Sequence, residues 1–191
     1  MRVITGVYKG RIINTVTDLS VRPATDRVRQ TVFDMLANRI EFEGATVLDL
    51  FAGSGSLGIE ALSRGAAHVT FVERGEEAVQ HLKHNVRSLG CEAATEICEM
   101  DAMIFLKGRQ SSYDLVFADP PYAFDRTEEI PQVVFREKMV KPQGYLIVEH
   151  SKDVRFEGTP LYRKGPEKRF GRTVVTFFQN TAEPMTKHEL S

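Results

Sequence analysis

Between residues 46 and 150, short apolar runs alternate with segments whose apolar residues recur at helical spacing. The apolar runs, which we expect to be strands, lie at residues 46–50, 68–72, 94–98, 113–118 and 144–150. Most of them are apolar throughout, which is typical of strands in a parallel sheet with both faces covered. The pattern therefore predicts an α/β fold, with helices on both faces of a mostly parallel sheet.

The C-terminal part of the chain departs from this alternation. Residues 173–179 form a β-branched and aromatic run that follows directly on a short strand expected near Leu161. Two consecutive strands favour an antiparallel hairpin at the edge of the sheet. The expected sheet therefore has seven strands and includes an antiparallel edge strand.

The N-terminal part is expected to form a small extension. Residues 3–5 and 11–13 are separated by a segment that contains two glycines, which favours a hairpin or an extended arm. Beyond Thr25, a suitable N-cap, apolar residues at helical spacing predict a helix. The predicted organisation is a basic hairpin and helix extension (1–40), an α/β domain (41–180) and a disordered tail (181–191).

The composition is that of an ordinary globular protein. Hydrophobic residues make up 42% and charged residues 27% of the 191 residues, which suits one domain with a proper core. No window approaches the roughly 18 apolar residues of a membrane span, and the N-terminus has no apolar leader. Cys91 and Cys98 lack metal-ligand spacing and are expected to be reduced. We therefore expect a cytoplasmic chain without a metal site, and we favour a monomer.

The net charge of −1 hides two basic flanks. Residues 1–39 carry seven basic and three acidic side chains, and residues 152–172 carry the same numbers, so each flank has a net charge of +4. Residues 40–151 carry 10 basic and 18 acidic side chains. Charged flanks are often merely solvated. If the fold brings these two together, they form a surface for a polyanion such as a nucleic acid.

A glycine-rich turn follows the strand expected at residues 46–50. The sequence VLDLFAGSGSLGIE matches the G-x-G-x-x-G nucleotide-binding pattern at Gly53, Gly55 and Gly58, and Glu73 ends the next expected strand. Glycines let the backbone approach a ligand closely, and an acid after the second strand accepts hydrogen bonds from ribose hydroxyls. The alternative is a tight turn without a ligand. The strand–turn–helix context favours a nucleotide-containing cofactor.

Asp49 separates the two natural cofactor candidates, NAD and S-adenosylmethionine. It lies inside the strand, four residues before Gly53, where its negative charge would repel a diphosphate. Asp49 and Glu73 would instead attract a cofactor that carries sulfonium and ammonium groups. Asp101, after the third expected strand, can accept a hydrogen bond from an adenine amino group, or it can cap the following helix. These residues favour S-adenosylmethionine.

Residues 119–122 read DPPY and follow the fourth expected strand. Ligands of doubly wound sheets bind beyond the carboxyl ends of the strands, so this corner is expected beside the glycine turn. The exocyclic amine of a nucleobase is a poor nucleophile because its lone pair is delocalised into the ring. The Asp119 carboxylate and the Pro120 carbonyl can accept its two hydrogens, the prolines keep these acceptors in place, and a flipped-out base can stack on Tyr122. The alternative is a purely structural turn.

Together, VLDLFAGSG and DPPY resemble the amino-group branch of the class I methyltransferases. The segments RVITGVYKGRI, RPATDRVRQTVFDML, LGIEALSRGA and KRFGRT are similar to the bacterial 16S ribosomal RNA guanine-N2 methyltransferases, whose target is guanine 966 of the small subunit. This resemblance extends from about Arg2 to Phe178. It implies a Rossmann-like class I methyltransferase fold, S-adenosylmethionine as cofactor, and 16S ribosomal RNA in an assembled or partly assembled small subunit as partner.

The resemblance also implies roles for individual residues. The implied cofactor site contains Asp49, Phe51, Ala52, Gly53, Gly55, Glu73, Arg74, Asp101 and Ala102. The implied catalytic corner contains Asp119, Pro120, Pro121 and Tyr122, and the family commonly has Phe at the last of these positions. The implied RNA contacts are Arg22, Arg27, Arg29, Lys168 and Arg169. Gln30 stands where Glu is expected, which leaves any role for that carboxylate open.

Two other functions remain open from the sequence. A methyltransferase acting on adenine N6 of DNA or RNA, or on protein glutamine, uses the same corner chemistry. Such enzymes usually carry Asn at the first corner position or a larger target-recognition domain, for which 191 residues leave little room. The other alternative is a non-catalytic nucleotide-binding or ribosome-assembly factor with a vestigial site, and the intact DPPY corner argues against it.

Overall fold

The structure, a computed structural model, describes residues 1–15 and 25–181. Arg22 and residues 182–191 of the expected tail lie outside the described residues. In chain order the strands are β1 (Thr46–Leu50), β2 (His68–Glu73), β3 (Thr95–Glu99), β4 (Tyr113–Ala118), β5 (Val140–Ser151), β6 (Arg163–Phe170) and β7 (Thr173–Gln179). The helices are α1 (Thr25–Leu36), α2 (Ser56–Ser63), α3 (Glu76–Leu89), α4 (Ala102–Gly108) and α5 (Ile130–Arg136), with short 3-10 turns η1 (Glu92–Ala94) and η2 (Thr127–Glu129).

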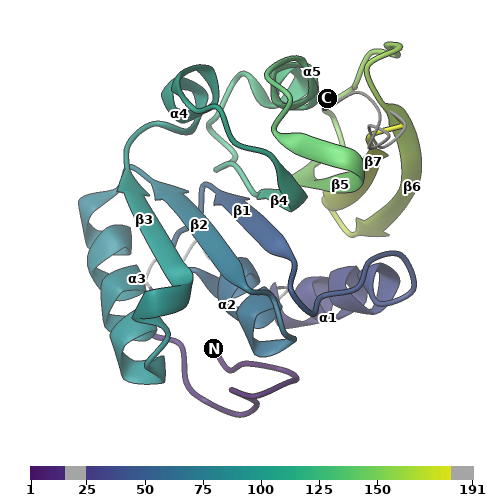
Figure 1. Ribbon diagram of the computed structural model, residues 1–191. Helices are drawn as coiled ribbons and strands as arrows, with labels where there is room; N and C mark the ends of the chain where they lie inside the picture. Colours follow the sequence, from purple (N-terminus) through teal and green to yellow (C-terminus); the bar gives the residue numbers. More distant parts are fainter. Residues whose placement is uncertain (16–24, 182–191) are drawn as a thin grey trace, which may run out of the picture.

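In the described part of the chain, the seven strands form one sheet in the order β3-β2-β1-β4-β5-β7-β6 (Figure 1). Strands β1 to β5 are parallel to one another, whereas β7 is antiparallel to both of its neighbours, β5 and β6. The mostly parallel seven-stranded sheet with a C-terminal antiparallel hairpin is therefore confirmed. Within this hairpin, β7 lies between β5 and β6, and β6 forms the edge of the sheet.

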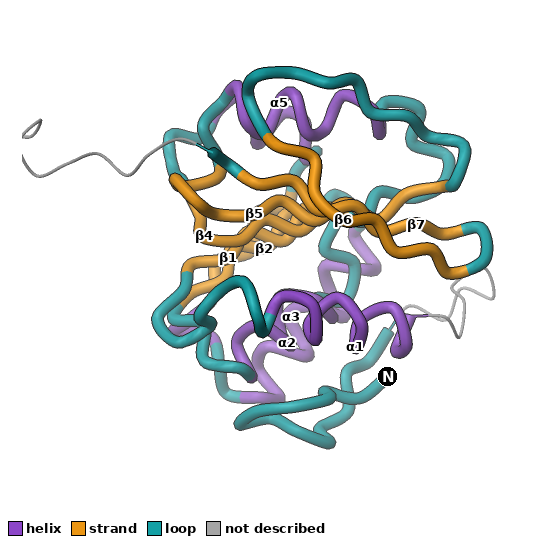
Figure 2. Tube along the Cα trace, turned by 90° about the vertical axis from the view of Figure 1, so that its right-hand side faces the viewer, coloured by secondary structure: helices purple, strands orange, loops and turns teal. Residues whose placement is uncertain are grey.

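Helices cover both faces of the sheet (Figure 2). Helices α1, α2 and α3 pack on one face, where Phe33, Leu62 and Phe117 belong to one buried apolar cluster. Helices α4 and α5 pack on the other face, where Leu106 and Phe135 belong to a second cluster. Because successive side chains of a strand point to opposite faces, every central strand contributes to both clusters.

The N-terminal residues form an arm that packs against α2. Its two sides are joined by hydrogen bonds from Val3 N to Arg11 O and from Gly10 N to Val3 O. The buried carboxylate of Glu60 on α2 accepts hydrogen bonds from Ile4 N at 2.8 Å and Thr5 N at 3.1 Å. The hairpin expected here is present as a short irregular arm, and its apolar residues share the core of the first sheet face.

Several element boundaries differ from expectation. The helix expected over residues 127–140 is split into η2 and α5 and ends at Arg136, and Pro131 lies in the first turn of α5, where its missing N–H costs nothing. Lys138 has a positive φ of 56°, which ends the helical geometry before β5 begins at Val140. Strand β5 begins four residues before the start expected at residue 144, and β6 begins at Arg163 rather than near Leu161, whereas β7 has its expected range.

Candidate active site

The glycine turn and the DPPY corner leave the sheet side by side. Strand β1 lies between β2 and β4, and Leu50 of β1 is paired with Ala118 of β4 at the carboxyl ends of both strands. The next residues, Phe51 and Asp119, therefore begin two neighbouring loops. This is the switch in strand order at which doubly wound sheets bind their ligands, as the sequence indicated.

The three glycines of the turn have different structural roles. A Cβ on Gly53 would meet nothing within 4 Å, so this backbone is open to a ligand. A Cβ on Gly55 would lie 2.5 Å from Leu82, and one on Gly58 would lie 2.4 Å from the Phe71 ring. Gly55 and Gly58 therefore allow α2 to pack closely against β2 and α3, while Gly53 leaves room for a bound molecule.

Phe51 adopts the left-handed conformation, with a φ of 58°. This region is strained for a bulky residue, and such strain persists only where the surroundings impose it. The ring of Phe51 packs edge-on against Phe124, with 5.1 Å between ring centroids. Phe51 thus connects the glycine turn to the loop that follows the DPPY corner.

Asp49 is 1% exposed, and its Oδ2 accepts a hydrogen bond from the Gly58 amide at 2.9 Å. Burial raises the pKa of this carboxyl well above its ordinary value, and the nearby acids Asp119 and Glu73 raise it further. A cation next to Asp49 would oppose this shift by favouring the charged form. The site is therefore suited to a positively charged ligand.

Glu73 and Asp101 follow the neighbouring strands β2 and β3 and lie at the same edge of the sheet. The Glu73 carboxylate accepts hydrogen bonds from the amides of Gly53 at 2.9 Å, Arg74 at 2.8 Å and Gly75 at 2.7 Å. Asp101 Oδ1 accepts from Met103 N at 2.8 Å and caps α4, while its Oδ2 lies 3.4 Å from Nη1 of Arg74. Helix capping, the alternative considered for Asp101, is thus present, and a role toward adenine stays a prediction.

The DPPY corner presents an anchored aromatic ring. Tyr122 is 62% exposed, and its hydroxyl oxygen lies 2.8 Å from Oγ1 of Thr173 at the start of β7. Phe124 N donates to Pro121 O at 2.8 Å and closes the corner. An exposed ring held at its hydroxyl end offers a flat face on which a base can stack.

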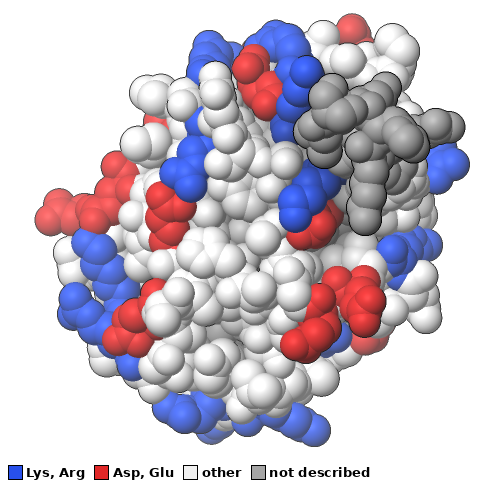
Figure 3. All heavy atoms as spheres, viewed as in Figure 1, with Lys and Arg blue, Asp and Glu red and all other residues white. Residues whose placement is uncertain are grey.

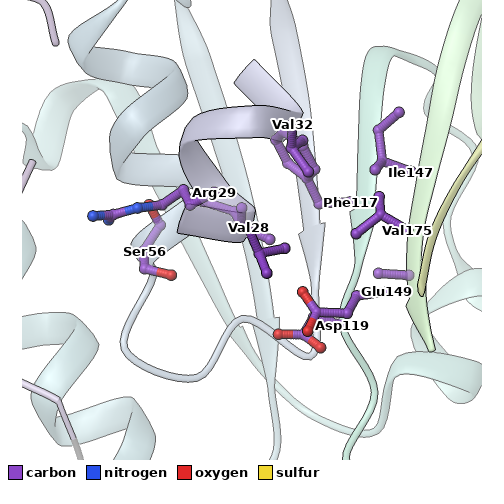
Figure 4. Close-up of a pocket in the computed structure, with 11 residues that line it drawn as sticks. Val28, Arg29, Val32, Ser56, Phe117, Asp119, Ile147, Glu149 and Val175 are labelled. Atoms are coloured by element: carbon purple, nitrogen blue, oxygen red, sulfur yellow. The ribbon is translucent and has the colours of Figure 1, made fainter. Parts of the chain in front are cut away.

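Sequence reasoning missed Glu149, which lies near the end of β5. Asp119 and Glu149 both line two cavities, one of about 40 Å³ toward α1 and one of about 70 Å³ toward Tyr122. Figure 4 shows their carboxylates side by side. The sequence did contain a signal for Glu149, because it follows an apolar run (146–148) just as Glu73 and Asp119 follow theirs.

Both carboxyl groups have raised pKa values. Solvent reaches Asp119 through the cavities, but the surrounding protein atoms desolvate the carboxyl group and raise its pKa to about 6. The pKa of Glu149 is raised to about 8 by burial and by the negative charge of Asp119. Pairs of carboxyl groups with raised pKa values are common at catalytic and binding sites.

The implied RNA contacts fall into two groups. Arg27 on α1 and Lys168 and Arg169 on the edge strand β6 are exposed. Arg29 is only 2% exposed, and its guanidinium donates to Arg2 O and pairs with Asp26 at 2.9 Å. Arg29 lines the cavity that contains Asp119, and its guanidinium joins α1 to the N-terminal arm, so a contact with RNA stays a prediction.

The fold brings α1 of the first basic flank and Lys168 of the second to the same face of the sheet. Val28 of α1 and Val175 of β7 line one cavity, and Val175 is paired with Lys168 of β6. Figure 2 shows α1 below the β6–β7 hairpin. Figure 3 shows further Lys and Arg side chains along the lower edge of another face, where the N-terminal arm lies in Figure 1.

Residues 1–179 match the protein family described as "Conserved hypothetical protein 95". The chain belongs to this family. It is 37% identical over 183 residues to "Ribosomal RNA small subunit methyltransferase D" of Haemophilus influenzae, a match that covers 94% of each chain. The protein of the same name from Escherichia coli K12 is 33% identical over 187 residues, covering 96% of this chain and 91% of that one.

A solved structure of the "Putative methyltransferase yhhF from Escherichia coli" superposes with a TM-score of 0.84 at 31% identity. The match covers 96% of this chain and 99% of that chain. The two chains therefore share the same overall fold over nearly their whole lengths.

Proposed function

We propose that this chain transfers a methyl group from S-adenosylmethionine to the exocyclic N2 amine of a guanine in 16S ribosomal RNA, at a site of the guanine 966 type. The observation that carries this proposal is the adjacency of the glycine turn and the DPPY corner at the carboxyl ends of β1 and β4. The relatives named as small-subunit ribosomal RNA methyltransferases support the choice of substrate.

The residues around the glycine turn fit the proposed cofactor. Asp49, Glu73 and Asp101 place three acids at the ends of adjacent strands, which suits a ligand with a positive charge and a ribose. The open space at Gly53 lets such a ligand approach the backbone. When bound, S-adenosylmethionine supplies a methyl group on a positively charged sulfur.

The corner residues act on the base. Asp119 accepts a hydrogen bond from the amine and is placed to receive the proton that nitrogen releases as the new N–C bond forms. Its pKa of about 6 suits that role near neutral pH. Tyr122 holds the flipped base by stacking. Most of the rate gain comes from orientation, because the stiff corner keeps its acceptors in place.

The RNA surface follows from the exposed basic residues. Lys168 and Arg169 lie on β6, which ends where the hairpin turns toward β7 and Thr173, the partner of Tyr122. Arg27 lies on α1, which covers the face of the sheet toward which Lys168 points, because Lys168 is paired with Val175 of the apolar cluster on that face. Phosphates held by these side chains would place a nucleotide at the corner.

We further propose that the substrate is the assembled small subunit or an assembly intermediate, and that the chain acts as a monomer in the cytoplasm. None of the helices in residues 1–15 and 25–181 has both the length and the hydropathy needed to cross a membrane.

The test uses small subunits from a strain that lacks this chain. Mass mapping of their 16S ribosomal RNA should reveal one missing N2-methylguanine, and the purified chain with labelled S-adenosylmethionine should restore it. Methylation of an adenine instead would favour the adenine-N6 alternative. Micromolar binding of the cofactor by calorimetry without any methyl transfer would favour a non-catalytic factor.

A further inference from the structure

Asp119 and Glu149 form a carboxylate pair at the wall between two cavities. Ala118 and Val148 are register partners in the parallel strands β4 and β5, so the residues that follow them emerge at the same level. Both residues line the cavity toward α1 and the cavity that contains Tyr122. A base stacked on Tyr122 would therefore face two carboxylates rather than one.

Two adjacent acceptors match one arrangement of base atoms. In guanine, the exocyclic N2 amine lies next to N1–H, so the edge presents two neighbouring donors. In adenine and cytosine, the ring nitrogen beside the amine is an acceptor. An ionised carboxylate that faces this nitrogen would repel its lone pair, and neither acceptor would have a donor.

We propose that Glu149 accepts the N1–H of the target guanine while Asp119 accepts a hydrogen of its N2 amine, so that the pair selects guanine over adenine and cytosine. This inference rests on the proposed function and assigns the base-reading residue of the same site. Flipped bases are commonly read through hydrogen bonds to this edge.

The neighbouring groups leave Glu149 available for this contact. Of the residues that line the two cavities, Arg29, Tyr122 and His150 are the other titratable ones in the described part of the chain. The Arg29 side chain points away from the pair in Figure 4. The ring nitrogens of His150 lie 2.8 Å from Ser151 O and from Thr176 Oγ1. On β7, the residue paired with Glu149 is the apolar Val175.

The pair has an energetic cost that a purely structural role does not explain. Burial raises the pKa values of both carboxyl groups, and repulsion by the negative charge of Asp119 raises that of Glu149 further, so the pair holds its negative charges poorly. A neutral side chain at residue 149 would avoid this repulsion. Substrate N–H groups that approach the pair would offset it.

The experiment compares the wild-type chain with Glu149→Gln, Glu149→Asp and the control Glu157→Gln, which removes an exposed carboxylate elsewhere. Each protein is assayed on small subunits from a strain that lacks the chain, with cofactor affinity measured by calorimetry and stability by thermal unfolding. We expect Glu149→Gln to lower kcat/KM by roughly 10- to 100-fold, the loss of one hydrogen bond to a charged group. Cofactor affinity should stay within about twofold, and the thermal midpoint should not fall.

The pH profile separates a base-reading role from a structural one. In the wild type, kcat/KM should rise as pH increases through the region where the pair ionises, because acceptance of two N–H groups requires both carboxylates. In Glu149→Gln, the rise in kcat/KM should move to lower pH and reflect ionisation of Asp119 alone, since the group with the higher pKa is gone, while Asp49 stays near Asp119 in both proteins. Glu149→Asp should keep more activity than Glu149→Gln.

Any one of three results would overturn this inference without touching the proposed function. The first is a Glu149→Gln chain with wild-type kcat/KM, and the second is a Glu149→Gln chain that loses activity together with thermal stability and cofactor affinity. The third is a Glu149→Asp chain that is no more active than Glu149→Gln. A wild-type chain that binds the cofactor but methylates no guanine would instead refute the proposed function.

Discussion

The carboxylate of Asp49, buried inside β1, holds the backbone amide of Gly58 on α2 at 2.9 Å. This hydrogen bond closes the glycine turn from within, because it joins the end of the strand to the first turn of the following helix. Gly58 can occupy this position only because it lacks a side chain, since a Cβ there would lie 2.4 Å from Phe71 and 2.7 Å from Val69. The first prediction follows from this contact.

We expect Gly58→Ala to destabilise the protein by about 1–3 kcal/mol, the usual cost of overpacking a filled core. Urea unfolding would measure the change. Gly108→Ala is the matched control, because a Cβ at Gly108 meets nothing within 4 Å, and it should be neutral or slightly stabilising. An equal loss in both variants would show that packing at Gly58 is not the cause.

Asp119→Ala should nearly abolish methyl transfer while leaving cofactor affinity within about tenfold, because the residue mainly orients the substrate amine. Transfer of labelled methyl groups and calorimetry measure the two quantities separately. Asp125→Ala, which removes an exposed carboxylate from the same loop, should retain activity. Parallel loss of cofactor binding and turnover in Asp119→Ala would contradict an orienting role.

Glu149→Gln should change how stability depends on pH. The pKa of Glu149 is about 8 in the folded chain, above an ordinary value of about 4.3, so the folded state binds this proton more tightly. As pH rises from about 4 toward 8, the free energy of unfolding of the wild type should therefore fall relative to that of Glu149→Gln. Below about pH 4, the difference between the two proteins should change little with pH. Urea unfolding at pH 4.5 and pH 8 would test this, and an equal difference at both pH values would contradict it.

Methylation should weaken as salt concentration rises, since phosphate contacts release counterions. The double variant Lys168→Ala, Arg169→Ala should bind subunits more weakly and reduce the salt slope by about one to two. Arg87→Ala is the control, because Arg87 is exposed on α3, which packs against β3 at the opposite edge of the sheet. A flat salt response of the wild type would count against a phosphate-binding surface.

Arg27 and Arg29 should behave differently although both lie on α1. Arg29→Ala removes the hydrogen bond to Arg2 O and leaves a partly buried acceptor without its donor, so we expect a loss of about 1–3 kcal/mol in stability. Arg27→Ala should change stability by no more than about 0.5 kcal/mol but should weaken RNA binding. Unfolding and subunit-binding measurements on both variants would distinguish these roles, and equal stability of the two would contradict the assignment.

The parts of this protein that follow from local pattern could be predicted. Runs such as residues 113–118 are apolar enough to require burial on both faces, and the positive φ of Gly53 and Gly55 is a conformation that glycine adopts without strain. The position of the DPPY corner beside the glycine turn followed from the general rule for parallel sheets. The first two of these inferences needed only residues close together in the sequence, and the third needed only a general rule of the fold class.

Other features depend on residues that meet only in the folded chain. The sequence predicts that Arg29 is an exposed cation on a helix, yet the N-terminal arm covers it and accepts a hydrogen bond from its guanidinium. Likewise, the carboxylates of Asp119 and Glu149 meet because β4 and β5 are paired in a particular register.

The sequence by itself determined the α/β alternation, the glycine turn and the stiff acidic corner, because each depends on local backbone preference and on burial of short apolar runs. Only the tertiary structure decided which charged groups are exposed and which face one another. The physical reason is that burial and electrostatic coupling depend on distances between residues far apart in the chain, and these distances are set by strand order, register and packing.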